Sequence, residues 1–388
     1  MKLTFRTFNC GMGDCIFLIL KKEDTSYHIM VDCGSLKGEI LTFVKNDLQE
    51  RIDLLVVTHI DNDHIAGLST MLEKLPDLKI GKILFNCYHR EQIGEQKSLS
   101  EKQNEAFEEL KHRLPLKEVE ATGKASAREA IGLSATILKD ERWAAAWGRK
   151  TTVAGNVIEL NGGYGKIKIL SPRQEDLDEL ENQFKKEFWM KFYQDYTQQF
   201  VKEEEIYEVL LRIWETTLTE ERTAKVAYTK PTGESFVKAA DEMVKPVTQP
   251  NRCSIAFVYE YEGHRILFLG DADPKLVADE INATFAEDKP VMMDLIKVSH
   301  HGSAHSTTKE MIQAADSAHY YFTGGNKEER PSLETLSRII TAGLHGQEKR
   351  TLHFNRKNKV VKDVMTLLEL VDYPCEIDLE NNPYEIEI

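Results

Sequence analysis

Three short apolar runs that end in histidine and aspartate constrain this chain more than any other feature. The runs are residues 52–58, 266–269 and 295–298, and each has the apolar character of a strand. The near-continuous run 52–58 is typical of a strand covered on both faces. The polar residues that follow these runs are His59, Asp61, Asp63, His64, Asp271, His300 and His301. Because open α/β sheets bind ligands beyond the ends of their strands, we expect these seven side chains to meet at one sheet edge.

These residue types predict a centre for divalent cations. Alternation along an extended segment puts His59 and Asp61 on the same side, and the tight turn after them aims Asp63 and His64 at a second point nearby. Hydrolytic metal centres use imidazole and carboxylate ligands together. A carboxylate can also bridge two ions about 3.5–4 Å apart. We therefore predict one or two divalent ions at this place.

The remaining pattern predicts a layered α/β fold that carries a helical segment. In the first ninety residues, strand-like runs alternate with helical spacings, and strands return from residue 254 onward. Between residues 173 and 225, apolar and aromatic residues recur every three or four positions, which is typical of amphipathic helices. We interpret this block as an insertion whose aromatic stripe is packing surface.

Composition narrows the classes of protein further. The chain has 50 Lys and Arg against 64 Asp and Glu, a formal net charge of −14, so any nucleic acid would need a local positive site. Six cysteines form no CxxC pair, which excludes a zinc ribbon and a disulfide-stapled module. The longest uninterrupted apolar stretch, residues 15–20, is too short to cross a membrane, and the N-terminus lacks a signal-peptide pattern. We predict a reduced, cytoplasmic protein with no membrane partner.

The segments THIDNDHIAG, FLGDAD and KVSHHGSAHS, in this order, resemble the metallo-β-lactamase-fold hydrolases. They are most similar to the branch typified by the hydrolase domain of the competence protein ComEC, whose opening turns residues 10–14 and 32–35 also resemble. The resemblance covers about half of the chain and implies a four-layer αββα sandwich with its metal site at one edge. The resemblance does not extend to the helical insertion. We predict residues 1–172 as the first half of the fold, 173–245 as the insertion and 246–388 as the second half.

The resemblance also implies a ligand set. One ion would be held by Asp63, His64, Asp271 and either His300 or His301, and the other by His59 and Asp61, with Asp271 as the bridge. The histidine of the pair that is not a ligand would contact substrate or donate a proton. Asp63 would orient the attacking hydroxide and accept its proton, and we take Asp63 and His301 as the catalytic residues. Asp14 is a candidate partner that orients a histidine ligand, and a turn cap is its alternative role.

Three departures from the family pattern bear on the metal and the substrate. Asp61 stands where the superfamily usually has histidine, although the ComEC-like branch carries aspartate there. The usual third histidine has no clear counterpart, and neither His89 nor His112 follows the expected pattern. Since oxygen-rich sites favour Mn²⁺ or Mg²⁺ more than three histidines would, we keep zinc, manganese and magnesium as candidate ions. Arg330 replaces a histidine of the branch, where it would clamp a phosphate or lie at the surface.

The predicted function is a metal-dependent hydrolase, a phosphodiesterase or nuclease that acts on DNA or RNA through a metal-activated hydroxide. Six basic residues support phosphate contacts, and a solvated hairpin explains them equally well: Lys349, Arg350, Arg356, Lys357, Lys359 and Lys362. The first alternative is a hydrolase of a non-nucleic ester, amide or thioester on the same fold. The second is a partner-binding protein that acts through the 173–225 helices, which could also pair two subunits.

Overall fold

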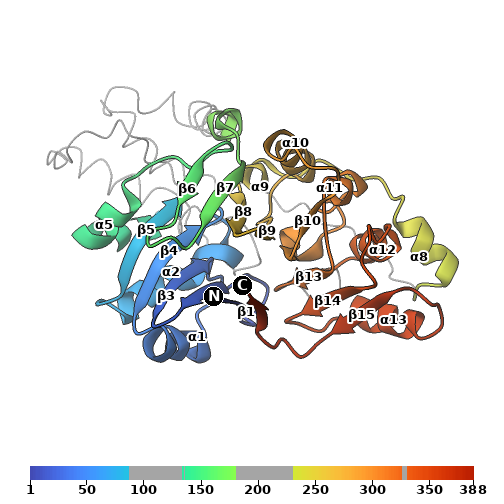
Figure 1. Cartoon of the computed structure of the whole chain (residues 1–388), viewed down its shortest axis with the longest axis horizontal. Coiled ribbons are helices and arrows are strands. Elements are labelled where there is room, and N and C mark those ends of the chain that lie inside the picture. Colours follow the sequence, from blue (N-terminus) through green and yellow to red (C-terminus); the bar gives the residue numbers. More distant parts are fainter. Residues whose placement is uncertain (87–132, 135, 181–229, 326–329) are drawn as a thin grey trace, which may run out of the picture.

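The computed structural model describes residues 1–86, 133–134, 136–180, 230–325 and 330–388. In this part of the chain the first sheet has the strand order β16-β1-β2-β3-β4-β5 (Figure 1). Its strands are β1 (Lys2–Thr7), β2 (Ile16–Lys22), β3 (Thr25–Val31), β4 (Arg51–Val57), β5 (Lys79–Phe85) and β16 (Tyr384–Glu387). Strands β3, β4 and β5 are parallel, so the carboxyl ends of β3 and β4 meet at one edge of the sheet.

The second sheet has the strand order β15-β14-β13-β11-β9-β8-β7-β6 among the described residues. Its strands are β6 (Val157–Glu159), β7 (Lys166–Ser171), β8 (Ala256–Tyr261), β9 (His264–Phe268), β11 (Leu295–Lys297), β13 (His319–Phe322), β14 (Arg350–Phe354) and β15 (Cys375–Asp378). The run from β9 to β15 is parallel, and β6 to β9 are antiparallel. A separate short pair joins β10 (Val291–Met293) to β12 (Ala315–Ser317).

Helices cover the outer face of each sheet (Figure 1). Those packed on the first sheet are α1 (Gly38–Thr42), the π-helix η1 (Phe43–Asp47), α2 (Asn62–Lys74) and α5 (Glu141–Trp147). Those packed on the second are α8 (Gly233–Ala239), α10 (Pro274–Thr284), α11 (Lys309–Ala314), α12 (Leu333–Thr341) and α13 (Lys359–Leu368). The short helices α9 (Gln249–Arg252) and η2 (Ser299–Gly302) precede β8 and follow β11.

Side-chain alternation in β4 explains the layers. Leu54 and Val56 point into a core shared with residues of the second sheet, including Phe257 and Phe268. The alternate residues, Leu55 among them, point into the core beneath α1, α2 and α5. A third core lies between the second sheet and its helices. The order helix, sheet, sheet, helix confirms the predicted four-layer αββα sandwich, in which β4 is covered on both faces as its apolar sequence predicts.

The predicted divisions at residues 172 and 245 remain a prediction. The sheets do not simply follow the order of the chain, because β6 and β7 pair within the second sheet and β16 returns to pair with β1. The predicted insertion helices fall mainly on residues 181–229, which lie outside the described residues. His89 and His112 also lie outside the described residues. No helix in the described part of the chain combines the length and apolarity that crossing a membrane requires.

The interpretation of residues 349–362 as a hairpin is wrong, and Arg350 does not belong to an exposed cluster that could contact phosphate. These residues form β14 and the beginning of α13. Arg350 is only 1% exposed, and its guanidinium pairs with Asp316. Lys349 pairs with Glu376. Charge density along the sequence misleads here because alternation in a strand turns Arg350 into the protein while its neighbour Lys349 faces solvent.

Candidate metal centre

The two sheets bring the ends of the three apolar runs together. β4 of the first sheet leads through Thr58 into the start of α2, whereas β9 and β11 of the second sheet lead to Asp271 and to η2. The Ile255 N–H donates to the Thr58 carbonyl at 2.8 Å and joins the sheets at this edge. The His300 N–H donates to the Gly270 carbonyl at 2.9 Å, which ties η2 to the end of β9.

Two glycine turns fix the start of α2. A Cβ atom on Gly13 would lie 1.7 Å from the Asp63 carbonyl oxygen, and one on Gly34 would lie 1.9 Å from the same atom. The Asp14 N–H donates to that oxygen at 3.0 Å. Any side chain at the two glycines would therefore displace the turn that carries Asp63 and His64.

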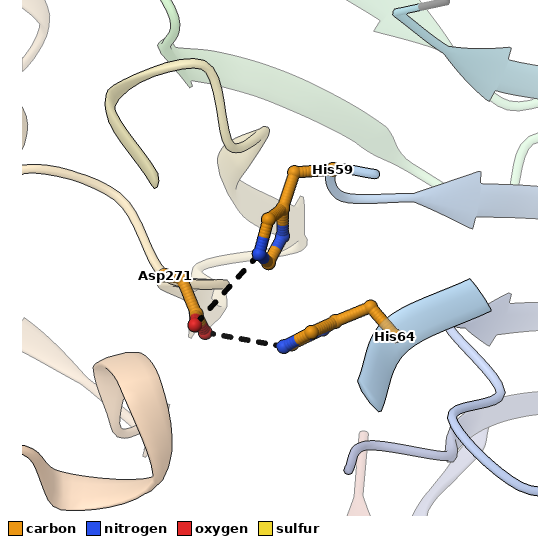
Figure 2. A group of neighbouring side chains, drawn as sticks. All are labelled: His59, His64 and Asp271. Atoms are coloured by element: carbon orange, nitrogen blue, oxygen red, sulfur yellow. Dashed lines mark ion pairs between the residues drawn. The ribbon is translucent and has the colours of Figure 1, made fainter. Parts of the chain in front are cut away.

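His59, His64 and Asp271 converge from three segments (Figure 2). His59 Nε2 lies 3.8 Å from Asp271 Oδ2, and His64 Nε2 lies 3.4 Å from Asp271 Oδ1. Asp61 Oδ2 is 3.6 Å from His59 Nε2. Asp271 thus faces both histidines at once, the placement expected of a shared ligand.

Four atoms at the point of convergence are buried without a hydrogen-bond partner in the described part of the chain. They are His59 Nε2, Asp61 Oδ1, His64 Nε2 and Asp271 Oδ1. A buried polar atom without a partner costs about 1–3 kcal/mol, so four such atoms at one point call for a missing partner. Imidazole nitrogens and carboxylate oxygens that face one another are the donor set of Zn²⁺ and Mn²⁺. The residues therefore fit a divalent metal ion.

The histidines of η2 point their Nε2 atoms to different carboxylates. His301 Nε2 lies 3.1 Å from Asp63 Oδ2, and its Nδ1 lies 2.8 Å from the Thr323 carbonyl, which fixes the proton on Nδ1. His300 Nε2 lies 3.4 Å from Asp271 Oδ2. Both residues adopt left-handed backbone conformations, with φ of 48° and 56°. The ligand atoms of Asp63, His64 and His301 lie within 4.8 Å of one another, as do those of His59, His64 and Asp271.

A layer of polar groups behind the histidines holds their Nδ1 atoms. Asp32 Oδ2 lies 2.8 Å from His64 Nδ1 and also accepts from the Thr58 hydroxyl at 2.7 Å. His59 Nδ1 lies 3.0 Å from the Thr58 hydroxyl and 3.3 Å from that of Ser254. Because each Nδ1 atom has a partner on the protein side, each Nε2 atom is presented to the centre.

Asp14 also belongs to this layer, as its predicted role of orienting a histidine ligand requires. Its Oδ1 lies 3.3 Å from His301 Nδ1, and its Oδ2 forms an ion pair with the buried Lys297. Sequence reasoning missed the roles of Asp32, Thr58 and Lys297, although Asp32 sits in the turn that resembles the family. Its φ of 59° at the end of β3 is visible only in the structure.

Opposite charges dominate the electrostatics of the centre. Burial lowers the pKa of His64, but the carboxylates of Asp271 and Asp32 outweigh burial and hold it well above its usual range. Burial raises the pKa of Asp271, but the surrounding histidines bring it well below its usual range. Burial also opposes the carboxylates around His301, which raise its pKa to about 9. The carboxylates thus favour the protonated forms of His64 and His301, and the histidines favour the ionised form of Asp271.

His300 differs from the other histidines. Burial lowers its pKa to about 3, opposed by the charge of Asp271 and reinforced by that of Arg330. Arg330 therefore lies close enough for its charge to act on the site. The seven predicted site residues are thus brought together where the two sheets meet, at the ends of β4, β9 and β11, instead of at the edge of a single sheet. Their roles as ligands or catalysts remain proposals.

Comparison with known proteins agrees with the fold. Residues 9–159 match the family model described as the metallo-beta-lactamase superfamily, a range that includes the 59–64 segment. This match over the first part of the chain agrees with the resemblance seen in the sequence. Membership of the superfamily and of its ComEC-type branch remains a proposal. No curated protein matches the chain.

Several solved structures resemble the chain weakly. The diiron β-hydroxylase CmlA from Streptomyces venezuelae is 12% identical with a TM-score of 0.39, and the match covers 99% of this chain and 54% of CmlA. YhfI from Bacillus subtilis is 9% identical with a TM-score of 0.38 and 99% coverage of both chains. Zn²⁺-bound PqqB from Methylobacterium extorquens is 9% identical with a TM-score of 0.38 and full coverage of both. The chain spans about half the length of CmlA, and likenesses at this level assign no activity.

Proposed function

We propose that this protein is a metal-dependent hydrolase that cleaves phosphodiester bonds, with DNA or RNA as its substrate class. The observation that carries the proposal is the group of four buried, unpartnered ligand atoms on His59, Asp61, His64 and Asp271. Groups arranged for folding alone would find partners, because unpaired buried polar atoms oppose folding. Their arrangement is explained if the protein binds one or two divalent ions.

The geometry favours one division of the ligands. His59 and Asp61 would hold one ion and share Asp271 with a second. Asp63, His64 and His301 would complete the second position, since their ligand atoms lie within 4.8 Å of one another. A bound divalent ion lowers the pKa of water and polarises a phosphoryl oxygen. Manganese and zinc both suit this mixture of carboxylate and imidazole, and we keep magnesium as a third candidate.

The proton steps then fall to the chain's own residues. Asp63 would orient the attacking water and accept its proton, since its carboxylate faces the centre with Oδ2 3.1 Å from His301 Nε2. The bond from water oxygen to phosphorus forms as the bond to the leaving oxygen breaks. With His301 engaged as a ligand, His300 is the histidine left to donate a hydrogen bond to that leaving oxygen, because its lowered pKa keeps the ring neutral.

Arg330 supports a phosphate-containing substrate. Its positive charge acts on His300, the histidine that would contact the leaving oxygen. Ser306 places its hydroxyl 3.3 Å from His300 Nδ1 and orients that ring. A guanidinium is suited to a phosphate because it offers two parallel N–H donors. This local charge replaces the 349–362 cluster as the basis for phosphate recognition in an acidic protein.

Cleavage of DNA by metal-stripped protein tests the proposal. Single- and double-stranded DNA would be incubated with Mn²⁺, Mg²⁺ or Zn²⁺ restored singly. We expect cleavage that requires one of these ions and is lost in Asp271→Asn. The matched control is Asp273→Asn, two residues further on, where the side chain caps α10 instead of facing the centre. Intact DNA with every ion would contradict the nuclease proposal and direct attention to other esters, amides or thioesters.

We also propose a reducing, cytoplasmic location. The described cysteines, Cys10, Cys15, Cys33, Cys253 and Cys375, are all free thiols, as expected for a protein that does not rely on disulfides. The 173–225 helices remain a proposed surface for a protein partner or a second subunit. Their role would be tested by deleting the segment and measuring both oligomeric state and cleavage.

A further inference from the structure

Lys297 is a lysine with 1% exposure at the end of β11, three residues before His300. Its ammonium forms an ion pair with Asp14 and has no hydrogen-bond partner beyond that pair among the described residues. A buried lysine is costly unless its charge is compensated. Its presence immediately behind the centre therefore requires an explanation that the hydrolytic steps above do not provide.

We propose that Lys297 is a positioning residue that holds Asp14 in place, so that Asp14 orients His301 with Nε2 toward the metal. The inference rests on the proposed metal-dependent function. The chain of contacts is continuous: Lys297 pairs with Asp14 Oδ2, and Asp14 Oδ1 lies 3.3 Å from His301 Nδ1. The Thr323 hydroxyl also donates to Asp14 Oδ1, at 2.5 Å. His301 Nε2 then faces Asp63.

The distribution of charge explains why a lysine occupies this position. The centre and the layer behind it contain five carboxylates, those of Asp14, Asp32, Asp61, Asp63 and Asp271. Asp14 lies on the Nδ1 side of His301, whereas metal ions would bind on the Nε2 side. An ion bound at His301 Nε2 would be separated from Asp14 by the imidazole ring. Lys297 supplies a permanent positive charge beside Asp14, on the Nδ1 side of that ring.

A purely structural role is the competing explanation, and a matched pair elsewhere in the sheet separates the two. Arg350 and Asp316 form a second buried cation–carboxylate pair, with exposures of 1% and 0%. Arg350 begins β14, at the opposite end of the parallel strands from the metal centre. Lys297→Met removes the lysine charge beside Asp14, and Arg350→Met removes the guanidinium beside Asp316, which keeps its 2.8 Å contact with His345 Nδ1. The two variants should destabilise the fold similarly, but only Lys297→Met should weaken metal binding.

The experiment is calorimetric titration of the metal-stripped full chain with Zn²⁺ alone and with Mn²⁺ alone, beside thermal melts without metal. We expect Lys297→Met to lose about 10- to 100-fold in affinity for at least one ion, the range found for groups that orient metal ligands. Arg350→Met should bind as the wild type does. Equal affinity of Lys297→Met and wild type would overturn the inference, while failure of the wild type to bind either ion would instead refute the proposed function.

A double variant keeps the test decisive if Lys297→Met does not fold. Asp14→Asn with Lys297→Met removes both charges and leaves neither buried ion unpaired. If the pair positions His301, the double variant should melt near the wild-type temperature yet keep the affinity loss. Recovery of both the melting temperature and the metal affinity would show that the pair serves folding alone.

Discussion

Replacement of Asp32 by Asn should disable His64 as a metal ligand without removing any ligand. Asp32 accepts three hydrogen bonds in the structure: from the Thr58 N–H at 2.8 Å, from the Thr58 hydroxyl at 2.7 Å and from His64 Nδ1 at 2.8 Å. Asparagine retains an oxygen for the Thr58 N–H and tolerates the φ of 59° at this position. Its amide nitrogen, however, would point its N–H groups at the N–H on His64 Nδ1, so that two donors face each other.

The conflict is relieved when the proton of His64 moves from Nδ1 to Nε2, the atom that faces Asp271. Hydrogen bonds to charged groups contribute about 1.5–3 kcal/mol, so the metal-binding tautomer becomes unfavourable by about 2 kcal/mol. Since 1.4 kcal/mol corresponds to a factor of ten in affinity, we expect a loss of about 30-fold. Asp32→Asn should therefore fold and bind metal weakly.

Calorimetric titration with Zn²⁺ and with Mn²⁺ measures this loss. The matched control is Asp53→Asn, because Asp53 accepts a 2.7 Å hydrogen bond from the His28 N–H in the same sheet and does not contact the centre. The control should bind metal as the wild type does. Wild-type affinity in Asp32→Asn would refute the assignment of Asp32 as the group that sets the His64 tautomer.

Three further predictions follow from the same geometry. Gly34→Ala should weaken metal binding and lower the free energy of unfolding by about 1–3 kcal/mol, because its Cβ atom would lie 1.9 Å from the Asp63 carbonyl oxygen. Gly38→Ala, with open space around its Cβ atom, should change neither quantity when measured by the same titration and thermal melt. Adding Zn²⁺ or Mn²⁺ to stripped protein at 100 times Kd should stabilise it by about 2.7 kcal/mol, seen as a higher Tm, and an unchanged Tm would count against specific binding. Burial and the charge of His353 lower the pKa of His319 to about 4. The neutral ring therefore contributes fully to stability above pH 6.5, and this contribution is lost as the pH falls through 4. In denaturant unfolding, His319→Gln should lose less free energy of unfolding over this pH interval than the wild type.

The sequence predicts well where the strands of the site end, and it predicts poorly which polar residues contact the ligand histidines. The apolar runs before His59, Asp271 and His300 predict strands because a strand buried on both faces has little choice of residue type. The metal-binding residue types at their ends are equally distinctive. The sequence predicts that these segments meet at one sheet edge. In the structure they meet where two stacked sheets come together, because β4 lies in one sheet and β9 and β11 in the other.

The polar layer behind the histidines could not be predicted in the same way. In the sequence, Lys297 is a single charged residue near the end of an apolar run, and no neighbouring residue indicates that Asp14 contacts it. The error at Arg350 has the same origin, since a basic residue in a charged stretch looks exposed until its partner Asp316 is located. Buried ion pairs depend on contacts between distant segments, whereas apolar periodicity is a local property of the chain.

The number of metal ions bound by the purified chain tests the central claim most directly. Metal-stripped protein would be incubated with Zn²⁺ or Mn²⁺, freed of unbound ion and assayed by elemental analysis beside the Asp63→Ala, His64→Ala double variant. We predict one or two ions per wild-type chain and a clear reduction in the double variant. No bound ion in the wild type, or equal metal content in both proteins, would contradict the assignment of this sheet edge as a metal centre.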